Sequence, residues 1–331
     1  MKDQIAAVLD RRSPFAVLCA RVEDVEPLLP DGCINLDLRD GPYHGQKGDA
    51  WDNEHSSAAS FLRWKGERFA AARRFLAPNG SIYDFASTAM GARVEVVMRE
   101  HFEVLSNIRW QKPSSVANRT EKEALRAPFP ASETILFAEQ RPTWPAMLEA
   151  ARVAAGLSRQ DVSERVLGSR SGACWNWEAG ISFPKGHHWE ALRSLLPALP
   201  SYEVIARPYA LSADVPYTDV WTYETVGTYD GKHPCEKPRA MAADMIRASS
   251  RPGDLVLVFF AGSGIFAAEA LAQGRRVIAV EADPYWAERT RAACAIAAET
   301  GVADIKRAAR TTPRSSKQGH PAQRSLFGEV G

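Results

Sequence analysis

The chain has 331 residues, 45% of them hydrophobic, which suffices for a full hydrophobic core in one large domain or in one domain with an insert. No apolar run is long enough to span a membrane, residues 1–12 lack a signal-peptide core, and the five cysteines show no metal-ligand spacing, so we expect a cytoplasmic protein without a metal site. The net charge of +1 carries no global signature of nucleic-acid binding, and any such function must rest on local features.

Seven short apolar runs bounded by Gly, Pro or Asp predict buried strands. They cover residues 15–20, 33–38, 80–85, 103–110, 132–138, 254–259 and 276–281. Helical patterns lie between them, the clearest over residues 58–76 and 284–299. Alternating strands and helices predict an α/β fold with an open parallel sheet covered on both faces.

The second predicted strand leads into the tetrapeptide Asp40-Gly41-Pro42-Tyr43. Its composition also fits an ordinary turn, because Asp-Gly and Pro are common turn formers. A carboxylate and a backbone carbonyl are nevertheless hydrogen-bond acceptors, and a tyrosine ring offers a face on which a planar base can stack. Ligands of doubly wound sheets bind beyond the carboxyl ends of strands, so this loop is a candidate site.

Residues 141–214 break the alternation with a high density of proline, and we interpret them as an inserted helical unit between residues 1–140 and 215–300. Within it, Ser158 followed three residues later by Asp161 predicts a capped helix that ends at Gly168. A second helix is predicted from Ser169 to about Gly180. Two short helices joined by a tight turn are typical of a helix-turn-helix.

This pair of predicted helices resembles the helix-turn-helix of phage-repressor-type proteins over residues 156–180, with Val162, Cys174 and Trp177 as the apolar contacts. The resemblance implies that the second helix enters the major groove of double-stranded DNA. Four side chains are then expected on its exposed face, where they reach base edges. They are Arg170, Ser171, Trp175 and Asn176.

The sixth predicted strand leads into Phe260-Ala261-Gly262-Ser263-Gly264, and the seventh ends on the acid Glu281. Glycines at the head of a helix let the backbone approach a nucleoside-like cofactor closely, and the acid is an acceptor for ribose hydroxyls. The same residues fit a dinucleotide fingerprint, so NAD is a second candidate. Too little chain follows Glu281 to complete a dinucleotide fold, which argues against it.

Residues 301–331 carry many basic and few acidic residues and are predicted to form a flexible basic tail. The tail either contacts DNA phosphates or is simply solvated. Near its end, the pentapeptide Gln323–Phe327 resembles the segment with which bacterial replication proteins bind the sliding clamp. This resemblance implies the sliding clamp as a further partner, and a homodimer is an additional expectation.

Taken together, the two loops resemble those of the DNA amino-methyltransferases in the permuted order of the beta class, where the catalytic half precedes the cofactor half. Asp40-Gly41-Pro42-Tyr43 is similar to the family's Asp-Pro-Pro-Tyr element, and His233-Pro234-Cys235-Glu236-Lys237-Pro238 to its His-Pro-x-x-Lys-Pro element. The resemblance covers residues 15–140 and 215–295. It implies a seven-stranded, Rossmann-like methyltransferase sheet.

The resemblance also implies the reaction, in which a methyl group passes from S-adenosylmethionine to the exocyclic amine of a base flipped out of DNA. Asp40, Gly41, Pro42 and Tyr43 are then the catalytic residues. The cofactor-binding residues are Phe260, Ala261, Gly262, Ser263, Gly264, Glu281, His233 and Lys237. A tetrapeptide that begins with Asp favours adenine N6 as the target, and a bacterial or phage-encoded, nucleoid-associated protein is implied.

Three departures from the family pattern leave alternatives open. Gly41 replaces the family's first proline, Val258 stands where an acid is usual, and Ile265 replaces a common threonine. We predict weaker cofactor affinity than in a typical member. The alternatives are a cytosine N4 methyltransferase, a DNA-binding regulator on a catalytically weakened methyltransferase scaffold, and an NAD-dependent oxidoreductase. Recognition of the DNA sequence is assigned to the insert.

Overall fold

The computed structural model of the chain describes residues 1–44, 55–112, 126–128, 130–209 and 218–312. Its strands are β1 (Phe15–Cys19), β2 (Ile34–Arg39), β3 (Leu76–Ala86), β4 (Glu103–Gln111), β5 (Ser132–Glu139), β6 (Val220–Thr222), β7 (Leu255–Phe259) and β8 (Arg276–Glu281). The amino-terminal helices are α1 (Lys2–Leu9), α2 (Val22–Val25), the 3-10 helix η1 (Glu26–Leu28), α3 (Ala58–Phe75) and α4 (Gly91–His101). The later helices are α5 (Trp144–Ala154), α6 (Arg159–Leu167), α7 (Ala173–Glu178), α8 (Gly186–Leu195), α9 (Tyr202–Ile205), α10 (Arg239–Ser249), α11 (Ile265–Ala272), α12 (Pro284–Thr300) and α13 (Ile305–Thr311).

The strands form one sheet in the order β1-β8-β7-β2-β3-β5-β4-β6, and the predicted α/β class is confirmed. All seven predicted strands are present. The structure adds β6, whose three residues are too short to produce a recognisable pattern. The sheet is mixed rather than wholly parallel, because β5 runs antiparallel to both β3 and β4.

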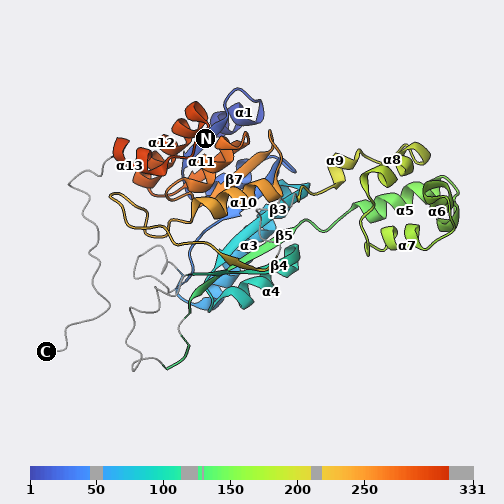
Figure 1. Cartoon of the computed structure of the whole chain (residues 1–331), viewed down its shortest axis with the longest axis horizontal. Coiled ribbons are helices and arrows are strands. Elements are labelled where there is room, and N and C mark those ends of the chain that lie inside the picture. The colour runs from blue at the N-terminus through green and yellow to red at the C-terminus, as the bar shows by residue number, and fades with distance from the viewer. Residues whose placement is uncertain (45–54, 113–125, 129, 210–217, 313–331) are drawn as a thin grey trace.

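Helices cover both faces of the sheet, as Figure 1 shows. The central strands alternate between the two cores: Leu36 and Val258 point into the layer shared with α10–α13, whereas Ile34 and Leu257 point into the layer shared with α1–α4. Strands buried on both sides consist of nearly continuous apolar residues, which explains why the sequence pattern located them.

The centre of the sheet is a topological switch point. β2 and β7 are parallel neighbours, with Leu38 opposite Val258 and Arg39 opposite Phe259. From β7 the chain passes through α11 on one face toward β8, and from β2 it passes through α3 on the other face toward β3. In doubly wound sheets, ligands generally bind at the carboxyl ends of two neighbouring strands whose connections diverge in this way.

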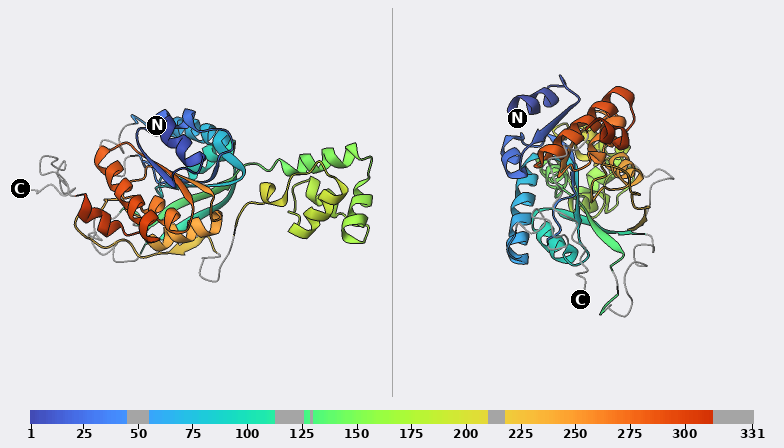
Figure 2. Two further views of the ribbon diagram at one scale, coloured as in Figure 1. Left: turned by 90° about the horizontal axis from the view of Figure 1, so that it is seen from above. Right: turned by 90° about the vertical axis from the view of Figure 1, so that its left-hand side faces the viewer.

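Helices α5–α9 assemble around a core of their own, separate from the two sheet cores. Trp144, Val162, Cys174 and Trp189 are among its buried members. Figure 2 shows these helices standing to one side of the sheet. Asn79 of β3 donates a hydrogen bond of 2.7 Å to the backbone of Glu203, so α9 lies nearest to the sheet.

The predicted flexible tail is wrong for residues 301–312. Gly301 ends α12 in the left-handed conformation, and α13 follows with Ile305 and Ala308 buried against the sheet core. Arg307 and Arg310 therefore lie on an ordered helix. Residues 313–331, including Gln323–Phe327, lie outside the described residues. Within those described, no helix has the combination of length and apolar character needed to cross a bilayer.

Candidate active site

The two predicted loops lie side by side. Asp40 follows β2 directly and Phe260 follows β7 directly, so the parallel pairing of these strands brings both loops to one edge of the sheet. The aromatic ring of Phe260 packs on the backbone of Gly41: a methyl group at Gly41 would lie 2.8 Å from Cε2 of that ring. Residues 220 positions apart in sequence thus lie side by side at one edge of the sheet.

A cluster of charged groups surrounds Asp40. The Nζ atom of Lys237 lies 2.7 Å from Oδ1 of Asp40 and 3.4 Å from Oε2 of Glu133. The single hydroxyl hydrogen of Tyr43 is shared between Oδ1 of Asp40, at 3.1 Å, and Oε2 of Glu133, at 2.8 Å. Lys112 pairs with the other oxygen of Glu133. The cluster joins the ends of β2 and β4, the start of β5 and the segment before α10.

The cluster is largely withdrawn from solvent, since the side chain of Lys237 is 4% exposed and that of Asp40 14%. Burial raises the pKa of Asp40, while the Lys237 ammonium opposes that rise and the Glu133 charge adds to it. Burial also acts to raise the pKa of Glu133, but the two lysines outweigh it and lower that pKa. Lys237 is therefore the cation that stabilises both carboxylates.

The cofactor loop is held by its own backbone. Gly262 and Gly264 adopt left-handed φ angles of 54° and 84°. The backbone N–H of Gly262 donates to Oε2 of Glu281 at 2.8 Å, and that of Asp283 donates to Oε1 at 3.0 Å. A side chain at Gly264 would lie 2.9 Å from the Thr290 Cα, so only glycine permits helix α11 to pack on α12 here.

His233 closes one side of this loop. Its Nδ1 accepts the backbone N–H of Cys235 at 3.2 Å, and its ring packs edge-on against Trp286 with centroids 4.5 Å apart. A Cβ at Gly262 would lie 3.1 Å from the His233 ring. The close approach shows that His233 and the glycine loop form one continuous surface.

These residues fit S-adenosylmethionine. Burial raises the pKa of Glu281, hydrogen bonds from the backbone oppose that rise, and the two carboxylate oxygens have acceptor positions beyond those used by the N–H groups of Gly262 and Asp283. Such an acid suits a ribose diol. The amino end of α11 has no side-chain cap, so its backbone N–H groups remain as donors for an anionic group of a ligand. Val258 stands where the family usually has an acid, and it is an apolar residue of β7 that is 1% exposed.

Sequence reasoning missed part of the site. Lys237 was predicted to bind the cofactor, and the contact of its ammonium with Asp40 was not part of that prediction. No role was predicted for Glu133 or Lys112, although Glu133 lies near the start of one predicted strand and Lys112 just beyond the end of another. Their positions in the strands could have indicated a role in the site, because β5 starts and β4 ends at the edge of the sheet where β2 ends. This arrangement depends on the direction of β5, which the sequence pattern does not encode.

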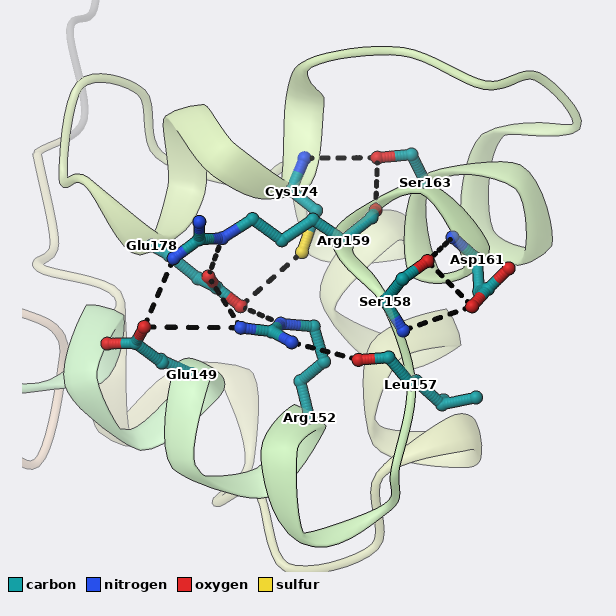
Figure 3. A network of polar contacts seen from close by, with 9 residues as sticks. All are labelled: Glu149, Arg152, Leu157, Ser158, Arg159, Asp161, Ser163, Cys174 and Glu178. Atoms are coloured by element: carbon teal, nitrogen blue, oxygen red, sulfur yellow. Dashed lines mark hydrogen bonds and ion pairs between the residues drawn. The ribbon is translucent and has the colours of Figure 1, made fainter.

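A second buried polar network holds the helical insert together (Figure 3). The side chain of Glu178 is 2% exposed and pairs with both Arg152 and Arg159. Arg152 also donates to the Leu157 carbonyl at 2.8 Å, and Arg159 pairs with Glu149 at 3.1 Å. Helices α5, α6 and α7 are thereby fixed to one another by a shared carboxylate, in addition to their apolar core.

The predicted helix pair is present with one correction. Ser158 and Asp161 form the capping box, and Gly168 ends α6 with a φ of 74°. Helix α7 begins at Ala173 rather than at Ser169, because the chain first passes through the turn that ends at Gly172. Val162, Cys174 and Trp177 are buried, as expected.

The late start of α7 changes the placement of the predicted DNA contacts. Arg170 and Ser171 lie in the turn rather than on the second helix, and Arg170 pairs with Glu164 at 3.0 Å. Trp175 lies on α7 with 50% of its surface exposed, and Asn176 is half-buried. Trp175 therefore presents the largest apolar surface of the four.

Comparison with known proteins agrees with this geometry. A family described as DNA methylase matches residues 34–291. DNA adenine methyltransferase YhdJ of Escherichia coli (strain K12) is 23% identical over 312 residues, which cover 91% of this chain and 88% of that protein. Type II methyltransferase M2.MboI of Moraxella bovis is 23% identical over 239 residues, 71% of this chain and 65% of that protein.

Solved structures show the same fold. PvuII DNA methyltransferase (cytosine-N4-specific) has a TM-score of 0.54 at 15% identity, over 84% of this chain and 86% of that chain. The M1.HpyAVI–SAM complex has a TM-score of 0.50 at 14% identity, over 84% and 97%. The predicted family and its cofactor, S-adenosylmethionine, are confirmed. The chain belongs to the DNA methylase family, whose members methylate adenine N6 or cytosine N4.

Proposed function

We propose that this protein methylates the N6 amine of an adenine flipped out of duplex DNA, with Asp40 as the acceptor for the amine. The observation that carries the proposal is the contact between Gly41 and the Phe260 ring, at the ends of two neighbouring parallel strands. A base held by the first loop lies beside a cofactor held by the second. Proximity of this kind makes the transfer effectively intramolecular.

The target amine needs activation, because its lone pair is delocalised into the ring. Two acceptors on its hydrogens turn the lone pair toward the donor methyl group, and the Asp40 carboxylate with the Gly41 carbonyl supplies them. Tyr43 contributes a ring face for stacking of the flipped base, and Pro42 stiffens the loop. The bound cofactor supplies an electrophilic methyl group on sulfonium.

The bonds and charges of the transfer balance between the amine, the methyl donor and Asp40. As the bond between nitrogen and methyl forms, the bond between methyl and sulfur breaks and leaves a neutral thioether; the amine takes over the positive charge and loses one hydrogen as a proton to Asp40. Lys237 and Tyr43 stay hydrogen-bonded to Oδ1 of Asp40. The proton passes to water when the base leaves.

Adenine is the preferred target on two grounds. The tetrapeptide begins with Asp, and the relative that covers 91% of this chain is named a DNA adenine methyltransferase. Cytosine N4 is the alternative, since its amine needs the same two acceptors. The helical insert, through Trp175 and the turn residues Arg170 and Ser171, is the part that we assign to sequence recognition.

Labelled methyl transfer from S-adenosylmethionine to duplex DNA tests the proposal. The wild-type protein should label DNA, and Asp40→Ala should lower the rate by roughly a thousandfold or more, since it removes both an acceptor and a base. Cofactor binding should persist in Asp40→Ala. Equal labelling by both proteins would exclude Asp40 from the reaction. DNA binding without labelling by either protein would favour the alternative, a DNA-binding regulator on a catalytically weakened methyltransferase scaffold.

A further inference from the structure

The proposed reaction uses Asp40 but leaves its neighbours unexplained. Oδ1 of Asp40 receives two hydrogen bonds, from Lys237 at 2.7 Å and from Tyr43 at 3.1 Å. Among the described residues, no hydrogen bond reaches the other oxygen, Oδ2. The Asp40 side chain retains 14% exposure. The carboxylate is therefore held by one oxygen and presents the other as an acceptor.

Lys237 itself is fixed from several directions. Its Nζ lies 5.0 Å from the centre of the Phe85 ring and 5.4 Å from that of Tyr43, so two aromatic faces support the cation. Its second carboxylate partner, Glu133, lies at 3.4 Å. A buried lysine with two acidic partners and two aromatic faces has little freedom to leave the cluster.

The charges of the cluster are balanced. Two acids, Asp40 and Glu133, face two cations, Lys237 and Lys112. Of the two acids, Lys112 pairs with Glu133, whereas Lys237 contacts both. The remaining titratable groups that act on this pair are Tyr43, within the cluster, and Cys235, two residues before Lys237.

We propose that Lys237 and Glu133 are positioning residues for methyl transfer: Lys237 anchors Oδ1 of Asp40 so that Oδ2 faces the target amine, and the two residues together set the charge of that carboxylate. This inference rests on the proposed function. Only an ionised Asp40 accepts the amine hydrogen and takes its proton. Lys237 favours the ionised form, and the negative Glu133 beside it favours the protonated form.

The proposal predicts how the rate of methyl transfer depends on pH. Activity rises as Asp40 loses its proton, so the midpoint of the acidic limb reports the Asp40 carboxyl. Lys237→Met removes the cation and should move that midpoint to higher pH, with the rate near pH 7 falling by roughly a hundredfold and recovering in alkali. Glu133→Gln removes the opposing charge and should move the midpoint to lower pH.

The double variant Lys237→Met/Glu133→Gln supplies the rescue. With both charges gone, the midpoint should return toward that of the wild-type protein, and the rate near pH 7 should rise by roughly tenfold over Lys237→Met. A purely structural role predicts the opposite, because a second change in a damaged cluster lowers the rate further. Single-turnover rates from about pH 6 to about pH 10 measure these shifts.

Carbon-13 NMR of the aspartate carboxyl groups in the cofactor-free protein gives an independent readout. The signal of Asp40, assigned by its loss in Asp40→Asn, should titrate at higher pH in Lys237→Met and at lower pH in Glu133→Gln. Unmoved midpoints in folded variants would overturn the inference. If Lys237→Met does not fold, Glu133→Gln alone decides.

The experiments distinguish failure of the proposed function from failure of the roles proposed for Lys237 and Glu133. If the wild-type protein transfers methyl groups but all variants lose rate equally at every pH, Lys237 and Glu133 are structural and the proposed function stands. If the wild-type protein transfers none, the proposed function fails, and NMR then reports only the charge of the Asp40 carboxyl.

Discussion

Gly41 and Phe260 form a matched pair at the residue scale. Phe260 holds a left-handed φ of 60°, a costly conformation for an aromatic residue, and its ring fills the space that a side chain at position 41 would occupy. The glycine that departs from the family's proline is thus required by the position of this ring. The departure reflects packing and does not by itself indicate a disabled site.

We predict that restoring the family's proline, Gly41→Pro, lowers activity instead of raising it. The new Cβ would lie 2.8 Å from Cε2 of Phe260, so the ring and the cofactor loop must shift. Overpacking of this kind costs about 1–3 kcal/mol and displaces the reacting groups. Methyl transfer and cofactor affinity should both fall at least tenfold. Activity equal to or above that of the wild-type protein would contradict the matched pair.

At the scale of elements, the 3-10 helix η1 carries a buried acid with a pH-dependent effect on stability. Burial raises the pKa of Glu26 to about 7, although Arg68 lies 2.9 Å from its carboxylate. The folded state therefore holds a proton that the unfolded chain has already lost. Stability is greatest below the ordinary pKa of a glutamate and declines as pH rises toward about 7.

Glu26→Gln should remove this part of the pH dependence. Near pH 5 the variant and the wild-type protein should unfold at similar urea concentrations, because a protonated glutamate resembles glutamine. Near pH 8 the variant should be more stable by about 2 kcal/mol. Urea unfolding followed by circular dichroism at both pH values measures this. A stability difference independent of pH would show that Glu26 does not titrate differently on folding.

Helix α7 gives a test of the insert's role. Trp175 is exposed on this short helix, whereas Trp177 is buried in the insert core. If α7 contacts DNA, Trp175→Ala should weaken binding to duplex DNA by roughly tenfold, the loss of one large contact. Ile181→Ala is the matched control, because Ile181 is 64% exposed but lies beyond the helix. Fluorescence anisotropy with labelled DNA measures both; equal affinities would remove α7 from the interface.

At the scale of the whole molecule, local sequence patterns predict the strands and loops that local residue composition determines. Buried strands such as β2 and β7 produce continuous apolar runs, and the loops that follow them were identified from their residues alone. The strand β6 was not predicted, because three residues are too few to show a periodic pattern. The start of α7 was predicted too early, because the turn that ends at Gly172 has no clear signature in the sequence. The contact of Lys237 with Asp40 depends on strand order and helix placement, which no window of sequence contains.

The chain order of the two halves has no effect on the site. β2 precedes β7 by more than half the chain, yet the sheet makes them neighbours. This is the order that the beta-class resemblance implies. The sheet therefore brings the two loops together whichever half comes first in the chain.

The most direct test of the account identifies the methylated nucleoside. Duplex DNA is incubated with the protein and S-adenosylmethionine, digested to nucleosides and analysed by mass spectrometry. The account predicts a methyl group on an exocyclic amine, with N6-methyladenine as the product and none formed by Asp40→Ala. Methylation at a ring carbon, or no methylated nucleoside from a protein that binds both DNA and cofactor, would contradict the claim that Asp40 and the Phe260 loop form one amine-methylating site.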